Sequence, residues 1–565
     1  MFDTPHLHSD WVNRELASLS LTEKLAQLLV AHLNPEHSTP ILQASLGPTP
    51  TGGYCLIGAD AKDVLRTTAW LQKREGVPPL IGANMEHGAG RIIRGATVFP
   101  DALALAAVND EKLALKQAVS MAREARAHGI SWSFSPVVDL QAHPHSPAVN
   151  TRGLGDCPER VIRLAENLIR GMQKNGLCAT ARHFPGDGFD DRDQHVCTTT
   201  NPLSMDAWHA TSGRIFKAVI DAGVHTIMTG HIALPACDPG TNRKLGAPPA
   251  TLSSRILLDL LRCELGFKGL ILAGPVDMGG ITSQGSHVEI LSGAINAGCD
   301  MLLFSNPSRD LPLLQRAVQR HILSEERIDE SVRRVLALKE HLQLHQPSPS
   351  PALTDDDRTR HAATARTISR RAVTVVRDRD SILPITLGRG RQILSIQVKG
   401  ASNRSLATID ECLRSSGADL TRMIAGEADL WISEDDVNSF DCILVHLLFC
   451  PTRSTARVRP GGMYMRTLSR LLSCRHPRVV LISYGSPYHG HDFPHLPTLI
   501  NAYSSDTQSQ KAVFDVLQGK LVPTATSPVC LDAPATLSEV WARETACRQA
   551  PNSERIILDG LTRNY

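Results

Sequence analysis

The chain contains no long apolar run: none of its stretches reaches the roughly 18 apolar residues that a membrane-spanning helix needs. Its first residues, Met1-Phe2-Asp3-Thr4-Pro5-His6, lack the basic region and apolar core of a secretion signal. The 13 cysteines include no Cys-x-x-Cys pair, which favours free buried thiols in a reducing compartment. These absences predict a cytoplasmic protein without a membrane partner.

Charge and loop motifs are also sparse. A net charge of only +2 gives no reason to expect nucleic acid. No Gly-x-Gly-x-x-Gly turn follows an apolar run, and no Gly-x-x-x-x-Gly-Lys loop occurs. Two histidine clusters, His143-Pro144-His145 and His489-Gly490-His491 with His495, have no acidic or thiol partner at regular spacing. We therefore expect neither a cofactor nor a metal site.

What the chain does have is a repeated rhythm between residues 51 and 339. A short apolar run, a polar or glycine-containing loop and a longer amphipathic stretch alternate, as parallel strands and crossover helices do. Seven runs fit the strand pattern: 53–57, 79–83, 132–138, 177–181, 225–228, 269–272 and 300–304. They predict a (β/α)8-type TIM barrel whose eighth strand is unassigned. A doubly wound open sheet is the main alternative, which the missing glycine-rich turn weakens.

A proline-serine run divides the chain. His345-Gln346-Pro347-Ser348-Pro349-Ser350-Pro351 cannot be helical and is typical of a linker. It predicts a barrel domain over 1–345, a linker over 346–360 and a second domain over 361–565. In that second domain four strand-like runs alternate with helical segments: 392–398, 441–449, 478–484 and 498–503. The simplest interpretation is a three-layer αβα sandwich around a partly parallel sheet.

The most informative segment is Ala181-Arg182-His183-Phe184-Pro185-Gly186-Asp187-Gly188, followed by Asp193-Gln194-His195. Because an apolar run precedes it, Arg182 and His183 are expected where a strand ends, the edge at which barrel enzymes do their chemistry. A carboxylate at Asp193 could hold the ring of His195 while the imidazole protonates a leaving oxygen. The intervening residues 189–192 look mobile and solvated, so the loop could close over a substrate.

This segment resembles the signature of glycoside hydrolase family 3. There Lys-His-Phe-Pro-Gly binds the sugar, and a later Asp-x-His supplies the acid/base dyad of the N-acetylglucosaminidase branch; here Arg182 replaces the lysine. Six further segments resemble the family in its order: 84–91, 136–139, 150–156, 228–235, 249–253 and 264–269. Similarity continues beyond the proline-serine run, at 372–377, 382–385, 484–488 and 502–505.

The resemblance implies a glycosidase that cleaves a β-N-acetylhexosaminide or β-glucoside, with a carbohydrate or carbohydrate-like small molecule as its ligand. It implies catalytic roles for His195 and Asp193. It also implies substrate contacts from seven positions: Asn84, Asp139, Arg152, Arg182, His183, His231 and Gly274. The planar forks of Arg152 and Arg182 suit sugar hydroxyls, and an arginine suits a bidentate contact better than a lysine.

Two positions depart from the family pattern. The family's sixth strand ends in Ser-Asp or Thr-Asp, whose aspartate attacks the anomeric carbon. The aligned segment here is Ala273-Gly274-Pro275-Val276-Asp277-Met278, so Gly274 stands at the nucleophile. Asn84 stands where many relatives have a sugar-binding aspartate. Glycine cannot attack, whereas retaining hydrolysis needs a second carboxylate roughly 5 Å from the acid.

Three hypotheses follow from this departure. In the first, glycosides are cleaved by another route: Asp277 becomes the nucleophile, the substrate's 2-acetamido group attacks, or water enters at Gly274 with inversion. In the second, His195 and Asp193 serve a lyase, isomerase or cyclase without a covalent intermediate. In the third, the barrel is a catalytically silent binding or scaffold protein. Cleavage is our working hypothesis because the dyad is present; the sugar, the acceptor (water or phosphate), the oligomeric state and a laboratory origin of Gly274 stay open.

Overall fold

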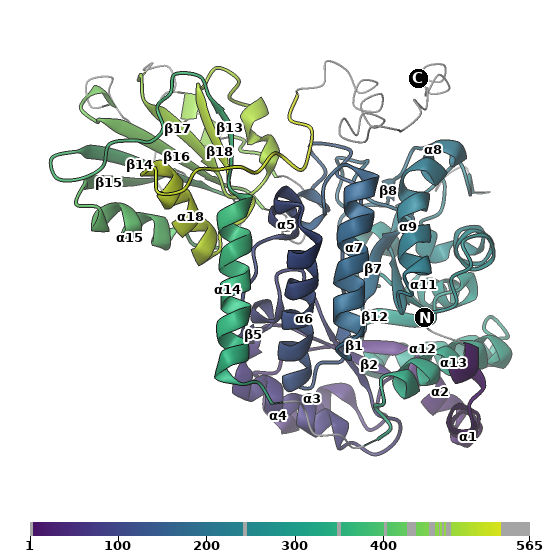
Figure 1. Cartoon of the computed structure of the whole chain (residues 1–565). Coiled ribbons are helices and arrows are strands. Elements are labelled where there is room, and N and C mark those ends of the chain that lie inside the picture. Colours follow the sequence, from purple (N-terminus) through teal and green to yellow (C-terminus); the bar gives the residue numbers. More distant parts are fainter. Residues whose placement is uncertain are drawn as a thin grey trace. The chain divides into compact units, whose positions relative to one another are not determined.

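The computed structural model describes residues 4–240, 246–346, 352–400, 404–425, 437–450, 458–462, 464–465, 468–469 and 476–532, which form two compact units (Figure 1). The first unit comprises Met1–Val98, Ala114–Leu140 and Val161–Ala362. The second comprises Phe99–Leu113, Gln141–Arg160 and Ala363–Tyr565. The proline-serine run at 347–351 lies outside the described residues, and from Asp355 the expected linker is the start of helix α14 (Asp355–Ala372). The boundaries 1–345, 346–360 and 361–565 stay a prediction.

The first unit is built on an eight-stranded sheet in the order β6-β4-β2-β1-β12-β11-β9-β7, in which every neighbouring pair is parallel. Two isolated parallel bridges, Trp132 to Cys178 and Val137 to Arg182, join the segment around β6 to that around β7. The sheet is therefore a nearly closed barrel, as predicted. Its strands are β1 (Leu29–Leu33), β2 (Gly53–Leu56), β4 (Leu80–Ala83), β6 (Trp132–Ser133), β7 (Thr180–Phe184), β9 (Thr226–Thr229), β11 (Leu270–Ala273) and β12 (Met301–Ser305).

Helices surround these strands in Figure 1, and they cover strand residues that are almost all buried. Short strand pairs, β3 with β5 and β8 with β10, lie outside the barrel sheet. The elements are η1 (Thr4–His8), α1 (Asp10–Ser18), α2 (Leu21–Gln27), α3 (Thr39–Leu46), β3 (Ala59–Asp60), α4 (Ala61–Gln72), η2 (Ala89–Arg91), β5 (Ile93–Arg94), α6 (Glu111–Ala127), α7 (Pro158–Gln173), β8 (Thr199–Thr200), α8 (Met205–Ala210), α9 (Ser212–Asp221), β10 (Ile232–Ala233), η4 (Ala250–Leu252), the π-helix η5 (Arg255–Glu264), α10 (Gly279–Thr282), α11 (His287–Ala297), α12 (Pro307–Gln319) and α13 (Glu325–His341).

The unassigned eighth strand is β1. It follows α2 with only Leu28 between them, and α2 begins with a capping box in which Ser20 and Glu23 exchange hydrogen bonds. Its five residues, Leu-Val-Ala-His-Leu, continue the apolar spacing of that helix, so the sequence indicates one longer helix. Each of the seven expected runs overlaps a strand, although 177–181 is displaced from Thr180–Phe184 and only Trp132–Ser133 of the run 132–138 forms a strand.

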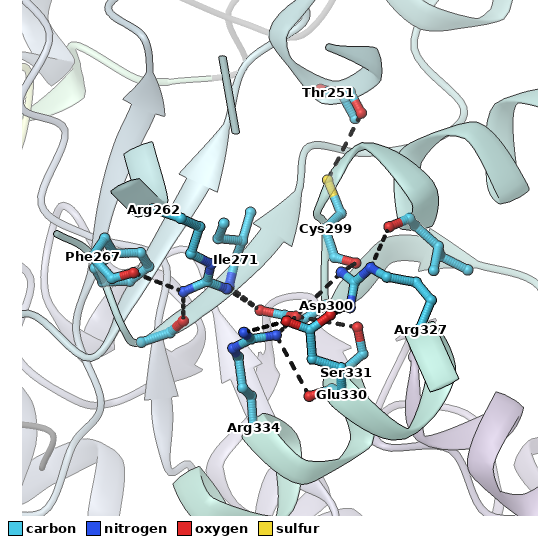
Figure 2. Close-up of polar contacts among 12 residues, drawn as sticks. Thr251, Arg262, Phe267, Ile271, Cys299, Asp300, Arg327, Glu330, Ser331 and Arg334 are labelled. Carbon is cyan, nitrogen blue, oxygen red and sulfur yellow. Dashed lines mark hydrogen bonds and ion pairs between the residues drawn. The ribbon is translucent and has the colours of Figure 1, made fainter. Parts of the chain in front are cut away.

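A buried ion cluster lies at the amino ends of the barrel strands (Figure 2). Asp300, directly before β12, is fully buried and accepts hydrogen bonds from Arg262 Nη2 at 2.7 Å and Arg334 Nη1 at 3.2 Å. Arg327 Nη2 lies 3.6 Å away, and the backbone amide of Ile271 donates to the same carboxylate at 2.9 Å. The cluster therefore ties β11 and β12 to the helices η5 and α13.

The second unit contains a six-stranded sheet in the order β13-β18-β17-β16-β14-β15, antiparallel only between β13 and β18. Buried apolar clusters cover both faces, and Figure 1 shows α15 and α18 along one of them. A separate sheet domain of the expected α/β type is thus present. Its elements are α5 (Ala102–Val108), η3 (Asn150–Arg152), β13 (Thr374–Asp378), β14 (Gln392–Lys399), α15 (Ala407–Ser415), β15 (Asp419–Ala425), β16 (Cys442–Leu448), β17 (Val479–Ser483), η6 (Pro487–His491), β18 (Thr498–Asn501) and α18 (Thr507–Leu517).

The structure bears on the expected state of the cysteines and on the expected lack of a membrane-spanning helix. Ten of the described cysteines are free, whereas Cys157 is disulfide-bonded, so the expectation of free thiols is wrong at that position. Among the described residues, no helix combines the length and apolarity needed to cross a bilayer.

Candidate active site

Six of the predicted site positions lie at or just beyond the carboxyl ends of barrel strands. Asn84 follows β4, Asp139 follows β6, Arg182 and His183 lie within β7, His231 follows β9 and Gly274 follows β11. Because the strands are parallel, their carboxyl ends meet at one rim, which is where barrel enzymes carry their active sites. The structure therefore brings these six residues to the edge of the barrel at which the sequence analysis expects a site.

Arg182 is held by two side chains of the loop after β4. Its Nη1 donates to Asn84 Oδ1 at 2.9 Å, and its Nη2 forms an ion pair with Glu86. Both partners in that ion pair are more than nine-tenths buried. The guanidinium is thus partly committed to the protein, a contact that sequence reasoning missed because Glu86 carries no recognisable spacing to Arg182.

Asp139 orients His183. One of its oxygens accepts from His183 Nδ1 at 2.7 Å, and both accept from the His183 backbone amide, at 2.9 and 3.0 Å. The amide of Asp187 donates to the same carboxylate at 2.8 Å. Asp139 is fully buried, and its hydrogen bonds hold the imidazole of His183 and the backbone of the loop after β7 in place.

Asp193 and His195 form the expected pair. His195 Nδ1 donates to Asp193 Oδ1 at 2.7 Å, and the His195 amide donates to the same oxygen at 2.9 Å. The side chain of Asp193 is 3% exposed, whereas that of His195 is 23% exposed. Within the described part of the chain no hydrogen bond to His195 Nε2 is found.

The loop between His183 and the pair is less solvated than expected. Phe189 is buried, and Asp190 accepts from the Thr200 amide at 2.9 Å and from Arg192 Nε at 2.9 Å. The loop leads into β8, which pairs with β10, the short strand that directly follows His231. The expectation of a solvated segment is therefore wrong for Phe189, whereas Asp191 and Arg192 are exposed; the expected mobility stays a prediction.

Gly274 is packed against its neighbours. A Cβ atom on Gly274 would lie 2.9 Å from the carbonyl oxygen of Thr229 and 3.2 Å from His231 Cε1. His231 Nε2 donates to the carbonyl of Pro275 at 2.9 Å, and its Nδ1 accepts from Thr251 Oγ1 at 3.0 Å. A side chain at this position would therefore require the strand ends to shift.

Burial lowers the pKa of His231 to about 4, so the ring is neutral near pH 7. The hydrogen bond to Pro275 opposes this shift, the charges of His183 and His195 add to it, and the charge of Asp277 opposes it. The charges of His183, His195 and Asp277 thus act on the pKa of His231, although burial is the main cause of its shift.

The loop after β11 carries Asp277 and contacts the loop of the acid/base pair. Gly279 N donates to the His195 carbonyl at 2.9 Å, and Gly280 N donates to the Gln194 carbonyl at 3.1 Å. Asp277 itself is exposed. The structure thus joins the backbone around the predicted acid to the loop that carries the predicted alternative nucleophile.

Arg152 belongs to the second unit. It ends η3, and its Nη1 donates to the Ala148 carbonyl at 3.0 Å. Within the described residues, no group of three or more histidine, cysteine or acidic side chains is arranged to hold a metal ion.

Comparisons with known proteins agree on one family. Residues 20–338 match the model of the glycosyl hydrolase family 3 N terminal domain. A beta-N-acetylglucosaminidase/beta-glucosidase from Cellulomonas fimi is 33% identical over 548 residues, which are 92% of this chain and 95% of that protein. The beta-glucoside phosphorylase BglX bound to 2FGlc has a TM-score of 0.85 and 30% identity, covering 94% of this chain and 97% of its own. A family 3 beta-N-acetylglucosaminidase from Paenibacillus sp. str. FPU-7 has a TM-score of 0.79 and 26% identity, covering 91% and 99%.

Proposed function

Because the chain belongs to glycosyl hydrolase family 3, we propose that it cleaves β-N-acetylglucosaminides, and more slowly β-glucosides, at the carboxyl rim of its barrel. One observation carries the proposal: His195 Nδ1 lies 2.7 Å from Asp193 Oδ1 while the ring remains partly exposed. A carboxylate that holds Nδ1 fixes the tautomer and stabilises the charged imidazole. This arrangement suits a general acid that delivers its proton from Nε2.

The first chemical step follows from that pair. His195 Nε2 gives its proton to the glycosidic oxygen as the bond from that oxygen to the anomeric carbon breaks, and the leaving group departs as an alcohol. The imidazole is then neutral and can accept a proton from an incoming water. Asp193 keeps the ring in one orientation through both proton transfers.

The attacking group is proposed to come from the substrate. Gly274 has no side chain, and Thr229 and His231 occupy its surroundings. The carbonyl oxygen of a 2-acetamido group can instead attack the anomeric carbon, giving a cyclic oxazolinium ion. Water then opens this ion after His195 takes its proton. Asp277, which is exposed after β11, is the second source of a nucleophile that the chain offers.

The remaining rim residues are proposed to bind the sugar. Arg182 and His183, fixed by Glu86 and Asp139, would donate to hydroxyls. Asn84, which is exposed, would contact the sugar at the same rim, whereas the roles of His231, Gly274 and Arg152 rest on the family resemblance alone.

Phosphate is a second candidate acceptor. Asn84 and Gly274 stand where the family pattern has aspartates, so the pocket has two fewer negative charges to repel an anion. The similarity to BglX over nearly both whole chains favours the same possibility. Phosphate would attack the anomeric carbon directly and release a sugar 1-phosphate.

An assay with matched substrates tests the proposal. Aryl N-acetylglucosaminide and aryl glucoside are incubated with the protein in phosphate-free buffer and then with added phosphate. We expect faster aryl release from the N-acetylglucosaminide, loss of release in His195→Gln, and a sugar 1-phosphate only if phosphate is the acceptor. Equal rates for wild type and His195→Gln on both substrates would refute general acid catalysis by His195.

A further inference from the structure

Gln194 lies between the two members of the acid/base pair and is 4% exposed. Its Nε2 donates to Asp187 Oδ2 at 2.7 Å, and its Oε1 accepts from the His231 amide at 3.1 Å. We propose that Gln194 is a positioning residue that sets the place of His195 relative to the sugar-binding loop. The inference rests on the proposed function, since it assigns Gln194 a role in the same site.

The first contact connects Gln194 to β7. Asp187, whose carboxylate accepts the hydrogen bond from the Gln194 side-chain amide, is nearly fully buried. Its own backbone amide donates to Asp139. Asp139 also holds the ring of His183. A chain of three hydrogen bonds therefore runs from the predicted sugar-binding imidazole to the side chain next to the predicted acid.

The other contacts connect Gln194 to β9 and β11. Its side-chain oxygen accepts a hydrogen bond from the backbone amide of His231, and its backbone carbonyl accepts one from the backbone amide of Gly280. A Cβ on Gly280 would lie 2.6 Å from that carbonyl, so glycine is what permits the close approach. One residue thus touches the loops after three barrel strands.

This arrangement has a mechanistic consequence. A general acid must keep its nitrogen within hydrogen-bond reach of the leaving oxygen, and small displacements cost large factors in rate. With Asp193 holding the ring and Gln194 holding the backbone, His195 is placed before substrate arrives. Gln194 then acts on catalysis through His195 and touches neither the sugar nor the reacting atoms.

The test uses the whole chain and three variants. Gln194→Leu removes both side-chain hydrogen bonds at similar volume. Gln194→Glu combined with Asp187→Asn restores both bonds: the new amide at position 187 donates to the new carboxylate at position 194, which still accepts from the His231 amide. Gln173→Leu is the matched control: Gln173 also bridges two backbone groups, the Gly223 carbonyl at 2.8 Å and the His225 amide at 2.9 Å, before β9.

Two measurements are compared across these variants. The first is the ring ¹⁵N spectrum of His195, which reports on its Nδ1 hydrogen bond and needs no activity. The second is the steady-state rate with the aryl N-acetylglucosaminide. We expect Gln194→Leu to change the spectrum and to lower kcat by about 10- to 100-fold with little change in KM. The double variant should recover most of both, and Gln173→Leu should alter neither.

The outcomes separate the two proposals. If wild type releases no aryl group but Gln194→Leu still changes the His195 spectrum, the proposed function fails and the positioning role stands. If wild type is active and Gln194→Leu leaves both spectrum and kcat unchanged, the positioning role is overturned. It is also overturned if the double variant is no better than Gln194→Leu, or if Gln173→Leu produces the same spectral change.

Discussion

Two buried aspartates lie at opposite ends of the barrel and are satisfied in different ways. At the amino ends, Asp300 is surrounded by Arg262, Arg327 and Arg334 (Figure 2). At the carboxyl rim, Asp193 holds the imidazole of His195, which is partly exposed. In the first arrangement the carboxylate is surrounded by three largely buried guanidinium groups, whereas in the second the carboxylate pairs with an imidazole ring that a ligand can reach. The difference separates a group that holds the fold from one that can react.

The energetics of the amino-end cluster follow from its burial. Burial raises the pKa of Asp300, yet the charges of Arg334, Arg262 and Arg327 outweigh it and hold that pKa below its usual range. Burial also lowers the pKa of Arg262 to about 10. Buried charges are tolerable only when paired, so each member of this cluster depends on the others.

Removing the Asp300 carboxylate should give the largest change in stability. Asp300→Ala leaves three guanidinium groups without their common partner, and we expect a loss of about 3–5 kcal/mol in the free energy of unfolding. Denaturant unfolding measures it. Asp221→Ala is the control, because Asp221 pairs with Lys217 on the surface and should cost less than about 1 kcal/mol. Similar losses in both variants would erase the contrast between the cluster and an ordinary ion pair.

Asp193→Asn should produce the opposite profile. An amide at this position cannot stabilise a charged His195, so we expect kcat for an aryl N-acetylglucosaminide to fall by about 10²- to 10⁴-fold. Stability should change by less than for Asp300→Ala, since the partner ring is partly exposed. Rate and denaturant midpoint are measured on the same preparation. A variant that unfolds readily but retains its rate would reverse the assignment of the two aspartates.

Gly274→Ala tests the packing at the rim. The new methyl group meets the Thr229 carbonyl at 2.9 Å, and overpacking of this kind costs roughly 1–3 kcal/mol. Gly293→Ala, within α11, meets only a flexible Leu252 methyl at 3.3 Å and should be neutral or stabilising. Thermal unfolding is measured for both variants. Equal melting temperatures would show that the strand ends around Gly274 shift at little cost in stability.

The pH dependence of stability gives the smallest effect. Burial lowers the folded pKa of His231 to about 4, so between pH 6.5 and 4 the unfolded chain binds a proton that the folded chain does not. Stability therefore falls as the pH drops below about 6.5, by roughly 1 kcal/mol at pH 5.5 for this histidine. Asp300, whose pKa is lowered, loses its contribution only at more acidic pH. Melting curves at pH 7.5 and 5.5 should show a drop that is smaller in His231→Gln.

Much of the barrel could be predicted because its signals are local. Short apolar runs followed by polar loops identify seven strands, and the strand ends place Arg182, His183 and Gly274 at the rim. β1 was missed because its residues continue the helical spacing of α2. Tertiary pairing with β2 and β12, which no local pattern reveals, makes it a strand.

The contacts within the site were harder to predict. The pairing of Asp193 with His195 follows from two-residue spacing, but that of Asp139 with His183 joins strands 44 residues apart. Glu86 and Gln194 offer no pattern of their own, and their roles depend on which loops meet in space. The crowding at Gly274 likewise depends on Thr229 and His231, which belong to another strand end.

Gly279 and Gly280, in the loop after β11, have a consequence for protein engineering. A Cβ on Gly279 would lie 2.3 Å from the Val196 carbonyl, so the loop after β11 and the loop of His195 are in backbone contact with no room for side chains. A library that varies one loop alone is expected to displace the other loop, and His195 with it. Positions 196–197 and 275–278 should therefore be varied together, with Asp193, Gln194, His195 and both glycines retained.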